Sequence, residues 1–204
     1  MITLANPVAW RGLRYPDSDL VGLIYRFARP GRDFPEPRPR AVDVACGPGR
    51  HVRLLEEVGF DAVGIDNDPE MCATARDNGV SAQCTDLRGF DPGRQLGLVV
   101  CWGITMLIPD LPTIVAGWGA RVVIADWRTP DNTCRQWPGN TALPNGAVRL
   151  RQEGHILDGQ EYFFFEPEAC QFPGYRRLHW QRVSRTAPDG EHNEWVQSVH
   201  ALEA

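Results

Sequence analysis

The chain has 204 residues, 43% of them hydrophobic, and a formal net charge of −5, which suits one α/β domain with a single core. It has neither a run of 18 apolar residues nor a signal-peptide pattern at its start, so we expect a cytoplasmic protein with no membrane partner. All 21 basic residues are arginine, which excludes Schiff-base and P-loop lysines, and the negative charge disfavours a nucleic-acid partner.

The first expected element is a helix that begins after Asp17 and ends by Pro30. Asp17 is a suitable N-cap, and apolar residues follow it at helical spacing. Residues 1–16 are expected to be irregular. Residues 30–40 contain four prolines and therefore predict a stiff connector without regular structure.

A glycine turn is the most informative feature of the sequence. Residues 41–44 predict a strand that ends in Cys46-Gly47-Pro48-Gly49, followed by a helix over 50–58 and a second strand over 61–66. Because glycine has no Cβ, such a turn lets a cofactor approach backbone N–H groups. Asp66, at the tip of the second strand, is placed to accept hydrogen bonds from a ribose. This combination indicates a nucleotide-containing cofactor.

Three further strands are expected at 80–84, 96–102 and 121–126, with helices at 69–78 and 109–117. The crossover at 86–96 contains two glycines and a proline, so we expect a loop or a single turn there. The strand at 96–102 is apolar throughout, as is typical of strands that are covered on both faces. The alternation of strands and helices predicts a parallel sheet with right-handed crossovers.

The last third of the chain has a different pattern. Pro188-Asp189-Gly190 indicates a hairpin between the last two strands. Residues 166–175 contain two prolines and a glycine, so only a stub of helix is expected before that hairpin. The expected strands are 147–152, 160–165, 176–186 and 194–202.

The stretch VDVACGPGRH, residues 42–51, resembles the first motif of the class I S-adenosylmethionine-dependent methyltransferases. In that motif an acidic residue stands two positions before a small-Cys-Gly-x-Gly turn. The resemblance implies an α/β fold with a Rossmann-like, seven-stranded, mostly parallel sheet, helices on both faces and a C-terminal antiparallel hairpin. It implies one domain, 1–204, with an N-terminal helical or lid segment (1–40), a cofactor-binding core (41–126) and a substrate-side elaboration with the hairpin (127–204).

The resemblance also implies S-adenosylmethionine as the cofactor and a small-molecule acceptor that receives its methyl group by in-line displacement. In the family the glycine turn approaches the methionine part of the cofactor. Ala45 stands where the family often has glycine, and a residue with a Cβ suits this position if its φ is negative. The residues expected to surround the methionine part are Ala45, Cys46 and Gly47. The end of the fourth strand lies beside the sulfonium in the family, so Trp102 either walls the methyl pocket or belongs to the core.

The nucleoside part is expected to meet two acids. In the family the acid that ends the second strand, here Asp66, holds the ribose, and the acid after the third strand, here Asp86, reaches the adenine amino group. Asn67 stands where an apolar residue often stacks on adenine, so Leu87 or Met71 is expected to supply that apolar contact.

Two further groups of residues are candidates for the site. Segments before the first strand cover the cofactor in many family members, so Arg14 and Tyr15 are expected near the methionine carboxylate. A general base is optional because the methyl group is already activated. If the acceptor loses a proton, the candidate bases are His155, His179 and Glu166. Trp127, Trp137 and Tyr162 suggest a flat or apolar acceptor.

Two alternatives remain open. A NAD(P)-dependent oxidoreductase would also use Gly47 and Asp66, although the third glycine of its usual motif is replaced by Val52 and no Tyr-x-x-x-Lys pair is present. A non-catalytic binding module with the methyltransferase fold is the other. The six cysteines lack C-x-x-C spacing and predict buried thiols rather than disulfides or a metal site. The sequence identifies neither the acceptor nor the oligomeric state.

Overall fold

A computed structural model describes residues 15–155, 157–187 and 190–203. A seven-stranded sheet of order β3-β2-β1-β4-β5-β10-β9 forms its centre. Within the described residues, β10 pairs antiparallel with both neighbours, and the other pairs in the sheet are parallel. The strands are Arg40–Val44 (β1), Asp61–Asp66 (β2), Ala82–Cys84 (β3), Leu98–Cys101 (β4), Val122–Arg128 (β5), Tyr175–Thr186 (β9) and His192–Leu202 (β10).

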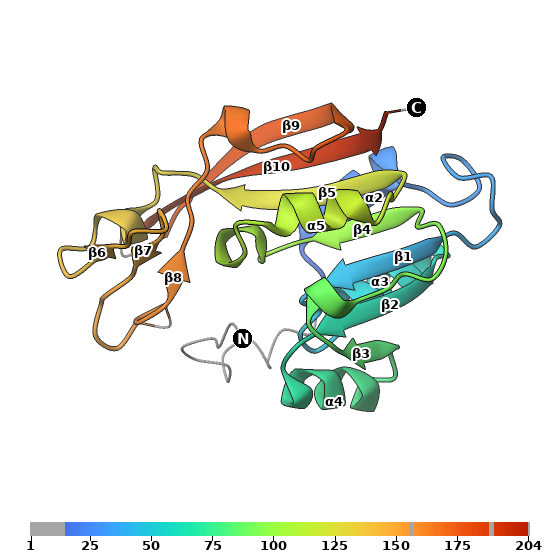
Figure 1. Ribbon diagram of the computed structural model, residues 1–204, viewed down its shortest axis with the longest axis horizontal. Coiled ribbons are helices and arrows are strands. Elements are labelled where there is room, and N and C mark those ends of the chain that lie inside the picture. The colour runs from blue at the N-terminus through green and yellow to red at the C-terminus, as the bar shows by residue number, and fades with distance from the viewer. Residues whose placement is uncertain (1–14, 156, 188–189, 204) are drawn as a thin grey trace.

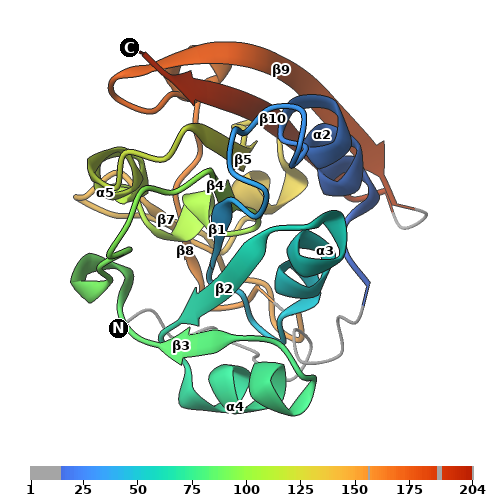
Figure 2. The same cartoon turned by 90° about the vertical axis from the view of Figure 1, so that its right-hand side faces the viewer.

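Helices cover both faces of this sheet, which confirms the predicted fold class (Figures 1 and 2). Helices α2, Ser18–Phe27, and α3, Arg50–Val58, lie on one face, and α5, Leu111–Gly117, lies on the other. Helix α4, Pro69–Asp77, packs beside β2 and β3 at one edge. None of the helices in the described ranges combines the length and the apolar character needed to cross a membrane.

Local sequence signals explain where these helices begin. The Asp17 carboxylate accepts a hydrogen bond from the Asp19 N–H at 2.9 Å and caps α2. The Asp68 carboxylate caps α4 in the same way, with Pro69 at the first helical position. The core has two parts, one on each face of the sheet, because strands β1, β4 and β5 are buried on both sides.

The crossover after β3 contains a single turn, as predicted, and so does the segment before the hairpin. The structure has four such short 3₁₀ turns in the described residues, at Leu87–Gly89 (η1), Thr105–Leu107 (η2), Thr133–Gln136 (η3) and Pro167–Ala169 (η4). The hairpin is formed by β9 and β10, although residues 188 and 189 of its predicted turn lie outside the described residues.

A second, three-stranded antiparallel sheet consists of Thr141–Ala142 (β6), Val148–Arg149 (β7) and Glu161–Tyr162 (β8). The predicted strands at 147–152 and 160–165 are therefore too long. Beyond β7 the Asp158 carboxylate accepts the Gln152 N–H at 2.8 Å and closes a loop. The Phe163 N–H donates to the carbonyl of Met106 at 2.8 Å and joins this sheet to η2.

The backbone at Ala45 corrects one expectation. Its φ is +56°, in the left-handed region, and not negative. The neighbouring Cys46 N–H donates to the carbonyl of Ile65 at 3.0 Å, which holds the chain against β2 directly after this residue. A left-handed alanine carries a strain of about 1–2 kcal/mol, so this bond and the glycines that follow keep Ala45 in an unfavourable conformation.

Candidate active site

The carboxyl ends of β1, β2 and β4 border a cavity of about 370 Å³. It lies where the strand order reverses, between β1 and β4, which is where open α/β sheets bind their ligands. Eight of the residues predicted to contact the cofactor line this cavity. They are Ala45, Cys46, Gly47, Asp66, Asn67, Asp86, Leu87 and Trp102.

Asp66 connects the glycine turn to the tip of β2. One carboxylate oxygen accepts the Gly47 N–H at 2.9 Å, and the other accepts the Asp68 N–H at 2.9 Å. Burial raises the pKa of Asp66, and these two bonds stabilise its charged form. Since a carboxylate oxygen accepts more than one hydrogen bond, Asp66 retains acceptor capacity toward the cavity.

Two glycines in and beside the turn have different roles. A Cβ on Gly47 would meet no heavy atom within 4 Å, so this residue leaves open space on the cavity side. A Cβ on Gly64 of β2 would lie 2.4 Å from the sulfur of Cys46. The turn therefore packs directly on β2 at Gly64, and it meets the cavity at Gly47.

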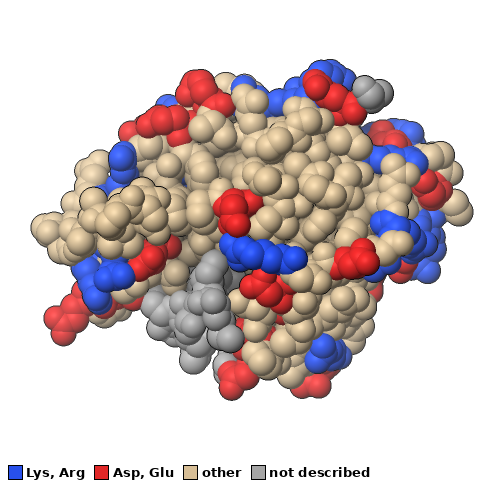
Figure 3. All heavy atoms as spheres, viewed as in Figure 1, with Lys and Arg blue, Asp and Glu red and all other residues tan. Residues whose placement is uncertain are grey.

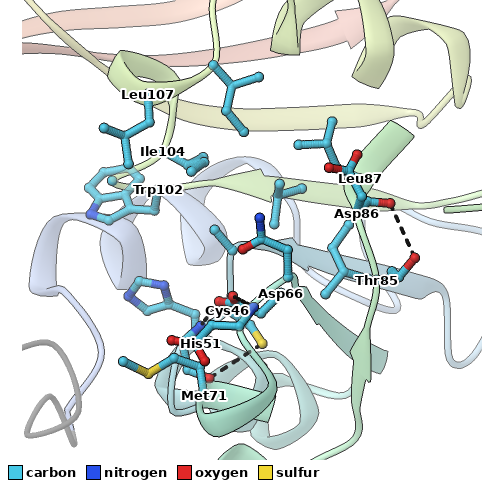
Figure 4. Close-up of a pocket in the computed structure, with 18 of the residues that line it drawn as sticks. Cys46, His51, Asp66, Met71, Thr85, Asp86, Leu87, Trp102, Ile104 and Leu107 are labelled. Carbon is cyan, nitrogen blue, oxygen red and sulfur yellow. Dashed lines mark hydrogen bonds between the residues drawn. The ribbon is translucent and has the colours of Figure 1, made fainter. Parts of the chain in front are cut away.

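The two ends of the cavity have different chemistry (Figure 4). Asp86 and Leu87 lie at one end, where the Asp86 carboxylate accepts the Arg88 N–H at 2.8 Å and caps η1. Met71 also lines the cavity, so both residues expected to supply an apolar contact are present. The other end is apolar and is formed by Trp102, Ile104 and Leu107, with Tyr162 from β8.

Arg50 and His51, which the sequence reasoning missed, also line the cavity. Arg50 donates from Nη1 to the carbonyl of Tyr15 at 3.1 Å. His51 is 4% exposed, and its Nδ1 lies 3.8 Å from a carboxylate oxygen of the buried Asp43. Their position in the first helical turn after the glycines was the available signal, together with the acid Asp43 between two valines of β1.

The structure brings none of the three candidate bases onto the cavity. His179 lies on the edge strand β9 and stacks on Phe27 with ring centres 5.1 Å apart. His155 packs against Trp137 in the region of the small sheet, with ring centres 4.6 Å apart. Glu166 directly precedes η4. Residue type alone suggested these groups, and the topology places them elsewhere.

The N-terminal candidates differ in what can be described. The side chain of Tyr15 is 83% exposed and is not part of the cavity lining, although its carbonyl accepts the bond from Arg50. Arg14 lies outside the described residues. Of the aromatic residues predicted to bound the acceptor, Tyr162 lines the cavity, whereas Trp127 is fully buried in the core and Trp137 lies outside the lining.

Comparison with known proteins identifies the matching family. Residues 41–122 match the model of a methyltransferase domain. A trans-aconitate 2-methyltransferase of Mycobacterium sp. (strain KMS) is 33% identical over 120 residues, covering 58% of this chain and 44% of the relative. One from Mycobacterium tuberculosis (strain ATCC 25177 / H37Ra) is 31% identical over 141 residues, with coverages of 67% and 52%. The chain thus spans about half the length of these relatives.

Solved structures show the same fold. Magnesium protoporphyrin IX methyltransferase from Synechocystis PCC 6803, with bound S-adenosylhomocysteine, aligns with a TM-score of 0.63 at 12% identity, covering 91% of this chain and 80% of that one. An S-adenosylmethionine-dependent methyltransferase from Mesorhizobium loti aligns with a TM-score of 0.59 at 16% identity, with coverages of 82% and 93%. Together with the cavity at the glycine turn, these matches show that the chain contains a methyltransferase domain, matched over residues 41–122, with the fold of the class I S-adenosylmethionine-dependent methyltransferases.

Proposed function

We propose that this protein transfers a methyl group from S-adenosylmethionine to a small-molecule acceptor by in-line displacement. The observation that carries the proposal is one cavity that joins the glycine turn and Asp66 to an apolar end at Trp102. The cofactor supplies an activated methyl group, so alignment of the acceptor and exclusion of water provide much of the rate.

The described residues fit this cofactor. The open space at Gly47 accommodates the methionine part, and the remaining lone pairs of Asp66 accept the ribose hydroxyls. Asp86 and Leu87 lie at the end suited to adenine, with Asn67 nearby in the lining. The roles of Ala45, Cys46 and Trp102 at the methionine part follow the same assignment, and the contact of Arg14 with the carboxylate stays a prediction.

The acceptor of the relatives does not carry over directly to this protein, because the match covers less than half of the first relative. Trans-aconitate, for which those relatives are named, is one acceptor to test. A nucleic-acid substrate is not part of the proposal. The net charge is −5, and Figure 3 shows arginines interspersed with acidic side chains on the face drawn.

We assign the protein to the cytoplasm, since the six cysteines are free thiols.

Calorimetric titration separates the candidate functions. S-adenosylhomocysteine should bind with a stoichiometry of one per chain, and NADH should not bind. Binding of NADH alone would contradict the proposal and favour the oxidoreductase, which the family matches do not. Transfer of label from methyl-labelled S-adenosylmethionine to extracted metabolites then distinguishes an enzyme from a non-catalytic binding module.

A further inference from the structure

The apolar end of the cavity offers a surface for a flat acceptor. Ile104 and Leu107 are 6% and 9% exposed and lie next to Trp102 in Figure 4, on the side of the cavity away from Asp86. Tyr162 adds a second aromatic ring to the lining. Burial raises the pKa of Tyr162 to about 12, so its hydroxyl stays neutral. This end therefore favours aromatic or aliphatic groups over charged ones.

The charges around the cavity disfavour an anionic acceptor. Asp66, Asp68 and Asp86 line it, and Asp43 is buried behind it. Of the two arginines in the lining, Arg88 is already paired with Asp110 at 2.7 Å. The excess of negative charge favours a cationic cofactor and repels a polycarboxylate. An uncharged acceptor suits these surroundings better.

The cavity lining also contains an imidazole, that of His51, with a ring nitrogen that is unpaired within the described residues. Its Nδ1 faces Asp43 at 3.8 Å, while its Nε2 and the second carboxylate oxygen of Asp43 have no hydrogen-bond partner among the described residues. Buried polar atoms without a partner are rare and need an explanation. Figure 4 shows the imidazole on the same side of the cavity as Trp102. An acid at Nδ1 favours the tautomer that leaves the Nε2 lone pair free to accept a proton.

We propose that the acceptor is an uncharged, flat molecule with a phenol-type hydroxyl, which lies against Trp102 and Leu107 and gives its proton to His51. A phenolic proton is acidic enough for an imidazole base, whereas an aliphatic alcohol holds its proton more tightly. The acceptor oxygen bonds to the methyl carbon, the carbon–sulfur bond breaks with its electron pair left on sulfur, and the proton passes to Nε2. The inference rests on the proposed function and specifies its acceptor.

Binding to the complex with S-adenosylhomocysteine tests this without any turnover. The probes are 2-naphthol, 2-methoxynaphthalene, which has the same rings without the proton, and trans-aconitate. We expect 2-naphthol to bind about three- to tenfold more tightly than its methyl ether, the range for one hydrogen bond, and trans-aconitate not to bind. His51→Leu should abolish the preference for 2-naphthol, and His179→Leu, a control far from the cavity, should keep it.

A second variant covers the case in which His51→Leu does not fold. Leu107→Asp adds a negative charge at the apolar end and should weaken 2-naphthol binding more than tenfold while S-adenosylhomocysteine still binds. Absence of 2-naphthol binding to the wild-type complex, equal or tighter binding of trans-aconitate, or an unchanged preference in His51→Leu would each overturn the inference. Failure of S-adenosylhomocysteine itself to bind would instead contradict the proposed function.

Discussion

At the scale of single residues, we expect Asp66 to affect both the glycine turn and cofactor binding. Its two oxygens already hold the N–H groups of Gly47 and Asp68. Asp66→Ala should weaken binding of S-adenosylhomocysteine by about 1.5–3 kcal/mol, the range for hydrogen bonds to a charged group. Asp66→Asn should weaken the binding of S-adenosylhomocysteine less, because the amide oxygen of asparagine still accepts one hydrogen bond. Calorimetric titration of both variants measures these differences.

The same strand provides a matched control for Asp66. Asp61 begins β2 at the opposite end and pairs with Arg94 on the surface. Asp61→Ala removes an equal charge from β2 and should leave the affinity for S-adenosylhomocysteine unchanged. Equal affinities of wild type, Asp66→Ala and Asp61→Ala would exclude the ribose assignment.

Substitution of Gly47 should mainly affect cofactor binding, and substitution of Gly64 should mainly affect stability. Gly47→Val places a branched side chain on the cavity side and should abolish cofactor binding. It should lower the free energy of unfolding by only about 1–2 kcal/mol, the strain of a side chain in the left-handed conformation. Gly64→Ala would overlap the Cys46 sulfur and should lower the free energy of unfolding by about 1–3 kcal/mol. Urea unfolding combined with titration separates the two effects. A folded Gly47→Val that binds normally would show that the turn is not the site.

The residues that line the cavity at the glycine turn were predictable because their positions depend on local sequence. A glycine turn after a strand, and acids that follow the next two strands, meet at one edge of any parallel sheet. His155, His179 and Glu166 were chosen by residue type alone, and side-chain chemistry carries no information about which strand lies at the sheet edge. His51 was visible only as a neighbour of the turn, and its pairing with Asp43 needs the helix to lie across β1.

At the scale of elements, a buried polar chain joins β5 to β10. The Trp127 indole N–H donates to the Ser198 hydroxyl at 2.7 Å, and that hydroxyl lies 2.9 Å from Nε2 of His200. Burial lowers the pKa of His200 to about 4. When the imidazole is neutral, the Ser198 hydroxyl accepts the Trp127 N–H and donates its own hydrogen to Nε2 of His200, so each group has a partner.

His200 should therefore make the fold sensitive to acid. The unfolded chain binds a proton at His200 below about pH 6.5, and the folded chain only below about pH 4, so stability falls as pH drops between these values. The full loss is about 3 kcal/mol. His200→Gln keeps an acceptor for Ser198 without titrating, so its urea midpoint should fall less between pH 7 and 4.5. An identical fall in both proteins would assign the acid sensitivity to other groups.

At the scale of the whole molecule, cofactor binding should stabilise the chain as a unit. A ligand that binds only the folded state at a hundred times its Kd adds about 2.7 kcal/mol. Thermal unfolding should therefore shift upward with S-adenosylhomocysteine and stay unchanged with NADH at the same concentration. The Gly47→Val variant should show no shift with either ligand. A shift with NADH alone would contradict the assigned cofactor.

The sequence predicted the sheet well and the last third less well, for a physical reason. Strands of four or more residues, such as β4 and β5, carry enough alternation or apolar character to be recognised. The strands of the small sheet have two residues each, too few to show a period. Their position depends on the backbone bond from Phe163 to Met106, which links residues far apart in the sequence.

That bond also joins the small sheet to the part of the chain that lines most of the cavity. Among the described residues that line the cavity, Tyr162 is contributed by the small sheet and the others lie between residues 44 and 108. We therefore expect that segment 137–165 can be exchanged without altering the residues proposed to hold the nucleoside. Grafting the corresponding segment of a longer relative onto this core should leave the affinity for S-adenosylhomocysteine unchanged and alter only the part of the acceptor end that Tyr162 forms.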